Sequence, residues 1–396
     1  MRNFTFKRQL LFVMFMLLGC LSIQATDDGL ITKQITIKLD EAGTLPNRIS
    51  ESKKYLITNL KIVGEVNGTD WRFIREMAGC DYNREKTDGK LSALDLSDAK
   101  IVEGGLPYMS YFDDQYISND KLGSYAFYGC SELTSLTIPP SVTSIGVSAF
   151  EGCSGLTSFT IPSSVTWIGW NAFQGCSGLT SFTIPSSVTS ISDCAFAGCS
   201  GLTSFTIPSS VTSIGGSAFE GCSGLTSFTI PSSVTSIEKL AFYGCSGLTS
   251  FTIPSSVTWI GDYAFYGCSD LTSFTIPSSV TSTGWGVFQG CSGLTSIYVY
   301  PEKLPKLGED MFSGCDAKNC IVYVPIGTYD DYLVSEFGYF ENIVEFDATG
   351  IDKVTTSNDA KELSRYSVNG QRLSAPAKGL NIVKYSDGSV KKVVVQ

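Results

Sequence analysis

The chain has 396 residues, of which 43% are hydrophobic, so it is long enough for two or three ordinary domains with a sizeable buried core. Its 28 basic and 38 acidic side chains give a formal net charge of −10, and a chain this acidic repels phosphate, which argues against a nucleic-acid or anionic-lipid partner. Histidine is absent, which excludes Ser-His-Asp and Cys-His catalysis, histidine-ligated zinc or iron, and an imidazole pH switch.

The first 25 residues are typical of an export signal. A basic start is followed by the apolar run Leu10–Leu18, which is too short to span a bilayer. Leu17-Leu18-Gly19-Cys20 resembles a bacterial lipobox and makes Cys20 a candidate for lipidation, although Leu18 is bulkier than lipoboxes prefer; cleavage after Ala25 is the alternative. No later apolar run is long enough to cross a membrane. We therefore expect an exported protein that is secreted or held at the cell surface, associated with the outer membrane.

Residues 26–90 are expected to form an N-terminal α/β cap. Period-2 alternation predicts strands, and apolar residues at helical spacing predict a helix with Asp70 as its N-cap. These elements are Thr32–Leu39, Asn59–Gly64 and Asp70–Ala78. Leu91–Leu96 then begins the L-x-x-L-x-L rhythm of a leucine-rich repeat.

The middle of the chain repeats with a period of 23 residues. Cysteines hold one position of the repeat, at Cys130, Cys153, Cys176, Cys199, Cys222, Cys245, Cys268 and Cys291, and Cys315 follows after 24 residues. Phenylalanines keep the same step, at Phe127, Phe150, Phe173, Phe196, Phe219, Phe242, Phe265 and Phe288. A fixed period of this length is the signature of a solenoid, in which each repeat forms one coil.

One unit, Ser154–Cys176, shows why these coils should stack. Its eight apolar positions are spread around the whole coil instead of along one helical face. Thr157–Ile161 is rich in β-branched and aromatic residues and should be a short strand, which Pro162 ends. Stacked copies of this strand, ~4.8 Å apart, form a parallel sheet, and eight coils span roughly 40 Å. The predicted fold is a leucine-rich-repeat solenoid over residues 91–346, with each Phe lying on its own copies.

The solenoid is expected to end in a closing unit, followed by a linker at residues 347–363. The closing unit comprises a strand, a helix and a further strand at Cys320–Pro325, Tyr329–Phe337 and Asn342–Phe346. Residues 364–396 are basic where the rest of the chain is acidic. Their β-branched runs and the turns at Asn369-Gly370 and Asp387-Gly388 predict a small β module.

The repeat unit L-T-S-F-T-I-P-S-S-V-T-S-I-G-x-x-A-F-x-G-C-S-G resembles the BspA-type leucine-rich-repeat surface proteins of Bacteroidetes. Residues 60–70, 94–97 and 320–346 resemble the N-terminal region and the closing unit of the same family. For function, this resemblance implies adhesion to host extracellular proteins or bacterial coaggregation. The tail at residues 364–396 resembles the C-terminal tails of exported Bacteroidetes proteins, which implies an export or sorting signal; a terminal β-extension without that role is the alternative.

The cysteine column has two interpretations. Metal or redox chemistry is disfavoured, because zinc sites use paired cysteines and each coil offers one inward thiol without a histidine. We therefore expect buried, apolar cysteines, and neither a metal nor a cofactor. Spacing leaves two exceptions open, which are Cys194 with Cys199 and Cys315 with Cys320. Two departures from the repeat, Thr283 in place of Ile and Val287 in place of Ala, indicate a weaker coil.

Specificity should lie at the positions where the copies differ, because the other positions serve the coil itself. Aromatic residues at or near such positions, on the returning side of the coil, are the interaction candidates: Trp167, Trp170, Trp259, Trp285, Tyr243, Tyr263 and Tyr266. The alternative is that these rings only cover the edge of the core. A second candidate surface is the outward strand face, where Ser158, Thr160 and their copies form a row of hydroxyls; a solvated strand face is the alternative.

The chain contains no Walker loop, no strand-to-helix G-x-G-x-x-G and no EF-hand loop, and its acidic pairs Asp113-Asp114 and Asp330-Asp331 are isolated. We therefore predict no catalytic residue. The sequence favours a monomeric, non-enzymatic, surface-held or secreted protein that binds an extracellular protein in the manner of an adhesin. A passive structural spacer and a glycan-binding module are the alternatives.

Overall fold

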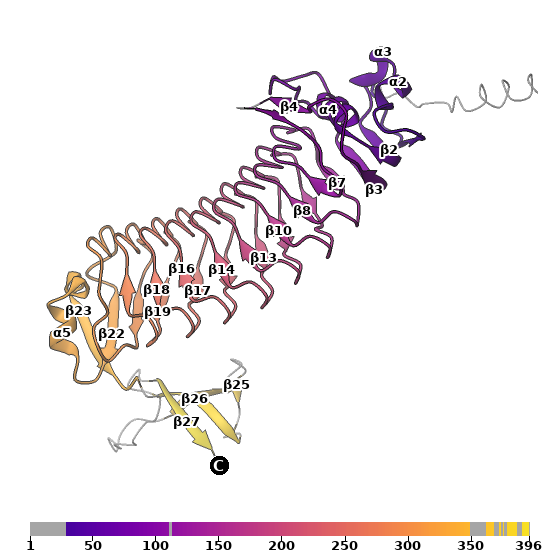
Figure 1. Ribbon diagram of the computed structural model, residues 1–396. Helices are drawn as coiled ribbons and strands as arrows, with labels where there is room; N and C mark the ends of the chain where they lie inside the picture. Colours follow the sequence, from indigo (N-terminus) through magenta and orange to yellow (C-terminus); the bar gives the residue numbers. More distant parts are fainter. Residues whose placement is uncertain are drawn as a thin grey trace, which may run out of the picture.

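The computed structural model describes residues 29–110, 113–348, 362–367, 372–373, 375, 378–385 and 390–395. The predicted export signal, with Cys20, lies outside the described residues. The central part of the chain is a β-solenoid whose coils stack along a single axis (Figure 1). The prediction of a solenoid built from parallel strands is confirmed.

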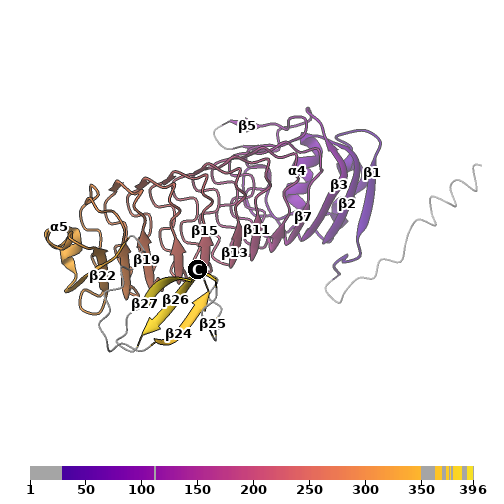
Figure 2. The same cartoon turned by 90° about the horizontal axis from the view of Figure 1, so that it is seen from below.

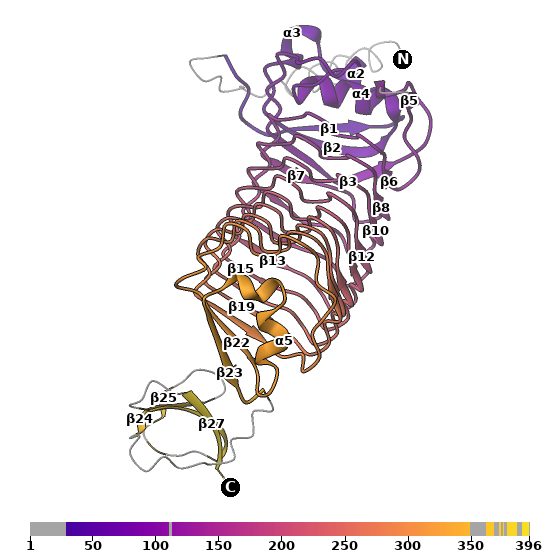
Figure 3. The same ribbon diagram turned by 90° about the vertical axis from the view of Figure 1, so that its left-hand side faces the viewer.

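The solenoid begins in a cap of parallel strands and short helices. The strands are β1 (Ile35–Leu39), β2 (Asn59–Val66) and β3 (Ala93–Ile101), and the helices are α2 (Leu45–Arg48), α3 (Glu51–Lys54) and α4 (Gly68–Met77). The helices lie at the same end of the stack as β1 (Figure 3). A short hairpin of β4 (Met109–Ser110) and β5 (Asp114–Gln115) precedes the first regular coil.

Helix α4 begins earlier than predicted. Its N-cap is Asn67, whose side chain accepts a hydrogen bond from the backbone N–H of Thr69 at 3.0 Å. Asp70, the third residue of the helix, completes a capping box with Asn67, and its carboxylate accepts from the backbone N–H groups of Asn67 (3.0 Å), Gly43 (2.6 Å) and Leu45 (2.9 Å). The prediction of Asp70 as N-cap was wrong, because Asn67 holds that position; the Asp70 carboxylate instead joins helix α4 to the start of α2.

One side of every coil is a strand of a parallel sheet, here called the front sheet (Figure 2). After β3 its strands are β7 (Ser135–Thr137), β9 (Ser158–Phe159), β11 (Ser181–Thr183), β13 (Ser204–Thr206), β15 (Ser227–Thr229), β17 (Ser250–Thr252), β19 (Ser273–Ile276), β21 (Ser296–Val299), β22 (Ile321–Pro325) and β23 (Asn342–Phe346). Equivalent residues pair in register, as the Ser-Phe-Thr segments of β11 and β13 do. Pairing is interrupted between β9 and β11 and between β13 and β15, which divides the front sheet into three blocks.

The other two sides of the coil are a short ladder and a turn segment. The second ladder consists of three paired blocks: β6 (Lys121–Leu122), β8 (Ser144–Ile145) and β10 (Trp167–Ile168); β12 (Ser190–Ile191) and β14 (Ser213–Ile214); and β16 (Ser236–Ile237), β18 (Trp259–Ile260) and β20 (Ser282–Thr283). On the turn side the chain passes through two left-handed positions, for example Asn171 (φ 56°) and Gly175 (φ 71°). Glycine adopts this conformation without strain, so the turn requires the glycine that precedes each cysteine of the repeat.

The core is built from two columns of phenylalanine rings. Rings of the column from Phe127 to Phe312 stack on their neighbours at 5.0–5.8 Å, with planes within 12° of parallel. The front-sheet column from Phe159 to Phe274 packs edge-on or tilted against it, as Phe196 and Phe205 do at 4.8 Å. The prediction that each Phe lies on its own copies is therefore confirmed, and the core has no single centre.

Side chains of Thr, Ser and Cys tie each coil to the preceding one. The Thr203 hydroxyl donates to the carbonyl oxygen of Thr180 (3.0 Å), and the Cys199 thiol donates to the carbonyl oxygen of Phe173 (3.2 Å). A serine column does the same for the carbonyl oxygens of the valines. These bonds satisfy carbonyl groups at corners that the two- or three-residue strands do not reach. They account for much of the Ser, Thr and Cys content.

The N-terminal end of the turn side is capped by donors from the cap domain. Within the stack, backbone N–H groups of the turn side donate to carbonyl groups of the following coil, so the first coil has carbonyls without such a donor. Arg75 donates to the carbonyl oxygens of Ala126 (3.1 Å) and Tyr128 (3.4 Å), and Trp71 Nε1 donates to Ala126 (3.0 Å). Arg75 is fully buried, so it acts as an internal cap of the solenoid.

Two short helical segments close the other end. They are α5 (Tyr329–Leu333) and the 3-10 helix η1 (Glu336–Tyr339), so the single helix predicted over 329–337 is divided in two.

The C-terminal part contains β24 (Glu362–Ser367), β25 (Arg372–Leu373), β26 (Gly379–Tyr385) and β27 (Val390–Val395), which form an antiparallel sheet in the order β25-β24-β26-β27. Within the described part of the chain, no helix has the length and apolar character needed to cross a membrane.

Candidate interaction surface

The seven aromatic candidates form two groups on the solenoid. The first group is Trp167 and Trp170, which belong to one coil. Trp167 lies in β10 of the second ladder and is 42% exposed, and Trp170 lies at the corner that follows and is 61% exposed. Both indoles extend into solvent, so covering the edge of the core does not account for them.

The second group lies in the coils between residues 243 and 285. The rings of Tyr243 and Tyr266 stack at 4.7 Å, and Tyr263 packs edge-on against Tyr266 at 6.0 Å. Trp259 is half-buried in β18, whereas Trp285 is 59% exposed at the corner equivalent to that of Trp170. In this group the tyrosines rest partly on one another, and Trp285 is the most exposed ring.

The structure does not bring all seven aromatic residues into one patch. Trp167 and Trp259 hold equivalent positions four coils apart, which corresponds to about 19 Å at ~4.8 Å per coil. The tryptophans of both groups nevertheless follow the same edge of the solenoid, along the second ladder and the corner after it. An extended partner could therefore contact both.

The corner that carries Trp285 is held by two local features. The Trp285 backbone N–H donates to the carboxylate of Asp262 in the preceding coil at 2.8 Å. The next residue, Gly286, has a left-handed φ of 55°, and a Cβ there would lie 2.4 Å from Cε1 of Tyr263. The Tyr263 ring thus occupies the space that any other residue at position 286 would need.

The described cysteines of the column are buried and form no disulfide bond. All twelve described cysteines are free thiols, so neither Cys194 with Cys199 nor Cys315 with Cys320 forms a disulfide. Burial raises the pKa of the Cys199 thiol to about 12, and that of Cys245 to the same value. The predicted burial is confirmed, and the thiols add the hydrogen bonds to phenylalanine carbonyls that the sequence did not indicate. Cys194 is the half-buried exception.

The two departures from the repeat are accommodated in the core. Thr283 and Val287 are both buried. The Thr283 hydroxyl accepts a hydrogen bond from the backbone N–H of Gly308 at 3.3 Å and lies 3.4 Å from the sulfur of Met311. Its partners come from the segment in which the cysteine spacing lengthens to 24 residues. That this coil is weaker stays a prediction.

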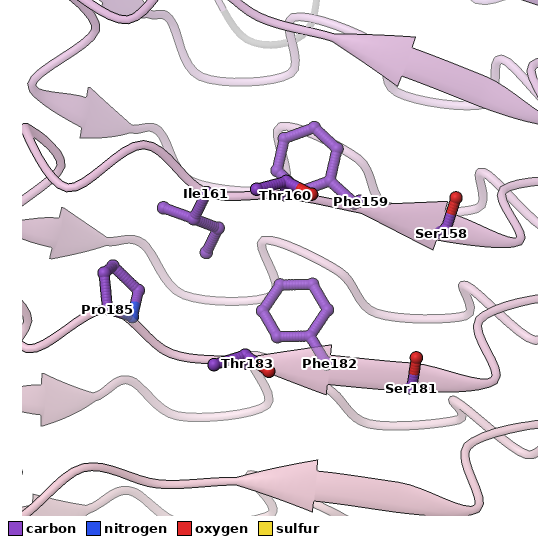
Figure 4. Close-up of a pocket in the computed structure, with 8 residues that line it drawn as sticks. All are labelled: Ser158, Phe159, Thr160, Ile161, Ser181, Phe182, Thr183 and Pro185. Carbon is purple, nitrogen blue, oxygen red and sulfur yellow. The ribbon is translucent and has the colours of Figure 1, made fainter.

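The outward face of the front sheet carries exposed Ser and Thr hydroxyls, and two openings interrupt it. An opening of about 360 Å³ lies between β9 and β11, where Figure 4 draws its lining residues: Ser158, Phe159, Thr160, Ile161, Ser181, Phe182, Thr183 and Pro185. A second, of about 530 Å³, lies between β13 and β15. Sequence reasoning missed both, because the coils on either side have the same S-F-T-I-P-S-S segment and no residue marks the interruption.

The repeat region contains few charged side chains that could act in catalysis or bind a metal ion. Between Ser131 and Thr295 there are seven acidic residues, and Lys239 is the only basic one. Within the described residues, no group of three or more Cys, Asp or Glu side chains is placed to hold a metal ion.

Comparison with known proteins identifies the repeat. The model of the BspA type leucine rich repeat region matches residues 120–246 and 213–334, which together are more than half of the chain. The chain belongs to this family. A search of the curated proteins found no match.

Two solved structures illustrate the similarity of this BspA-type chain to other leucine-rich-repeat proteins. A leucine-rich repeat protein from Bacteroides ovatus is 29% identical, with a TM-score of 0.49, over 60% of this chain and 67% of its own. A leucine rich cell surface protein from Faecalibacterium prausnitzii is 26% identical, with a TM-score of 0.36, over 79% of this chain and 87% of its own.

Proposed function

We propose that this protein is a non-enzymatic, adhesin-like protein that binds an extracellular protein through its exposed tryptophans. The observation that carries the proposal is the placement of Trp167, Trp170 and Trp285, which are 42%, 61% and 59% exposed. They hold positions where the coils differ, on a scaffold whose other outward residues are mostly Ser and Thr. Tryptophan is enriched among the residues that dominate binding energy at protein interfaces, and exposed large apolar side chains mark interaction sites.

The repeat supplies variants that should remove these rings without disturbing the fold. Serine occupies the position of Trp167 in coils such as that of Ser190, and aspartate occupies the position of Trp285 at Asp262. We would measure binding of the purified full chain to immobilised extracellular matrix proteins, and expect Trp167→Ser and Trp285→Asp together to weaken it at least tenfold, about 1.4 kcal/mol or more.

The control for this experiment is Ser158→Ala on the front sheet, which removes an exposed hydroxyl and should leave protein binding unchanged. Thermal unfolding of each variant would show whether the fold is retained. Saturable binding that survives the loss of the tryptophans would contradict the proposed surface. No saturable binding to any matrix protein would favour the passive spacer.

A glycan-binding function is the second candidate, and the front sheet supports it. The opening between β13 and β15 combines apolar and hydroxyl-bearing side chains, including Phe205, Thr206 and Thr229, and none of its lining residues is charged. Uncharged pockets of this composition suit a neutral sugar. Binding to a panel of neutral glycans should be lost on Thr206→Val and Thr229→Val, and kept in the tryptophan variants. The opposite pattern would reject the front sheet as a glycan site.

We further propose that the protein is exported and lies at the cell surface or in the extracellular space, and that the module of residues 364–396 serves as an export or sorting signal. Family membership supports a surface role, and the lipobox-like segment offers Cys20 as an anchor. The mass of the mature N-terminus in wild type and Cys20→Ala decides between the two cleavage sites. An unlipidated wild type that begins at Thr26 would reject the lipid anchor.

A further inference from the structure

The outward column of the front sheet changes character at its C-terminal end. Threonine holds the central outward position through β19, where Thr275 pairs with Tyr298 of β21. Tyr298 in turn pairs with Tyr323 of β22. The hydroxyl row of the repeats is thus continued by two aromatic rings in the last coils, at the orange end of the solenoid in Figure 1.

These two tyrosines belong to a compact aromatic cluster. The rings of Tyr298 and Tyr323 stack at 4.6 Å with an interplanar angle of 6°. Phe346 of β23 stands nearly perpendicular to them, at 6.2 Å and 6.4 Å, and it stands at 88° to Tyr300 at 5.3 Å. All four residues are half-buried, so the cluster presents ring surface to solvent and is separate from the phenylalanine core.

A cavity of about 330 Å³ adjoins the cluster and is lined by Ser278, Tyr300, Glu302 and Ala348. Glu302 is exposed, and its carboxylate has no hydrogen-bond or ion-pair partner among the described residues. The hydroxyl of Tyr300 likewise has no hydrogen-bond partner in the described part of the chain. The cavity therefore combines an aromatic ring with a carboxylate that no residue of the described ranges neutralises.

The charge of the surrounding segment is also strongly negative. Residues 297–348 contain ten acidic side chains and three lysines. A negative potential of this kind attracts cations, and an aromatic ring beside a carboxylate holds an ammonium or guanidinium group by cation–π attraction and a charge-assisted hydrogen bond.

We propose that this pocket, formed by Tyr300, Glu302 and the adjoining cluster of Tyr298, Tyr323 and Phe346, binds a lysine or arginine side chain on an extended, basic segment of a partner protein. The cationic group enters beside Glu302, and the rest of the segment lies along the acidic end of the solenoid. This site is distinct from the exposed tryptophans and does not depend on the function proposed for them.

The proposal can be tested with hexalysine as the probe and the full chain as the receptor, by isothermal titration calorimetry at low and at physiological salt. We expect saturable binding that weakens with salt, and a three- to fivefold loss of affinity in Glu302→Gln and in Tyr300→Leu. Glu309→Gln is the matched control, because it removes the same charge from the same acidic segment without lining the pocket. It should change the affinity less than twofold.

Four further results would overturn or support the site. Equal losses in Glu302→Gln and Glu309→Gln would mean that only diffuse charge attracts the probe, which overturns the pocket. Spermidine that binds as tightly as hexalysine would overturn the assignment to a peptide segment, and a neutral glycan that competes with hexalysine would overturn the cationic ligand. Unchanged hexalysine binding in the Trp167→Ser and Trp285→Asp variants would support a site independent of the tryptophans.

Discussion

Raising the pH above 9 should destabilise the solenoid sharply, because its core thiols are buried as neutral groups. Burial raises the pKa of the thiols of Cys130, Cys199 and Cys245 to about 12 from an ordinary value of 9.0. The pKa values of four further thiols of the same column, at Cys153, Cys176, Cys222 and Cys268, are also raised well above 9.0. A raised pKa in the folded state means that stability is complete below pH 9 and is lost as the pH rises towards 12.

While the pH stays well below 12, the folded thiols keep their protons. The loss of folding free energy is then set by the pKa of the thiols in the unfolded state alone. At pH 10 each unfolded thiol has released its proton and each folded thiol has kept it, which costs about 1.4 kcal/mol per thiol. For these seven of the column's nine thiols the total is about 10 kcal/mol, comparable with the whole stability of an ordinary domain. Each of these seven coils releases one proton when it unfolds, so high pH also favours local unfolding of a few of them.

The assay is urea unfolding followed by circular dichroism at pH 8.0, 9.0, 9.5 and 10.0 with a reducing agent present. The free energy of unfolding should fall with a slope of about seven protons or more, because burial also raises the pKa of the Cys315 and Cys320 thiols, and a triple variant with Cys199, Cys222 and Cys245 replaced by Ala should lose three of these protons. The range stops at pH 10 because tyrosines and lysines, whose ordinary pKa values are about 10 and 10.4, titrate increasingly beyond it. A stability that is constant from pH 8 to pH 10, or a slope that is equal in the triple variant, would refute the reasoning.

Three other predictions concern single residues. Arg75→Met removes the donors to the first coil and should cost about 3 kcal/mol, with faster amide exchange around Ala126 measured by mass spectrometry. Gly286→Ala should cost about 1–2 kcal/mol in urea unfolding, because the new Cβ meets Tyr263 at a left-handed φ. Cys194 is the half-buried thiol, so a disulfide reagent at pH 8 should label it before the other described thiols, in a fast phase of the labelling reaction. This fast phase should disappear in Cys194→Ala. If it disappears in Cys199→Ala instead, Cys194 is not the accessible thiol.

The repeat could be predicted in detail because each of its positions meets its own copy. Phe173 contacts Phe150 and Phe196, so a column of buried rings follows from the period without further information. The outward Ser and Thr of the front sheet follow from the alternation of the strand. The thiol hydrogen bonds were not predicted, since the sequence shows that a cysteine recurs but not that a phenylalanine carbonyl faces it.

Features at the ends of the solenoid were harder to predict, because an end coil has no copy on one side. Asp70 looked like a helix N-cap in sequence, yet its carboxylate bridges Asn67 to a loop that the fold brings near. The stacking of Tyr298 on Tyr323 was also missed, since these residues are 25 apart and only the structure establishes that they occupy equivalent positions. Tyr298 does stand where other units carry Thr, and this substitution was the available signal.

The sequence by itself determined the coil, its length, its core columns and its scarcity of charge, because these depend on contacts between equivalent residues at a fixed separation. Only the tertiary structure decided how the ends are capped, where the front sheet is interrupted, and how the aromatic residues divide into groups. The interruption beside β9 cannot be derived from strand segments of identical sequence, and the pocket at Glu302 forms from segments that the chain returns to one place. Those features depend on distances between residues that are not equivalent in the repeat, and the repeat period does not determine these distances.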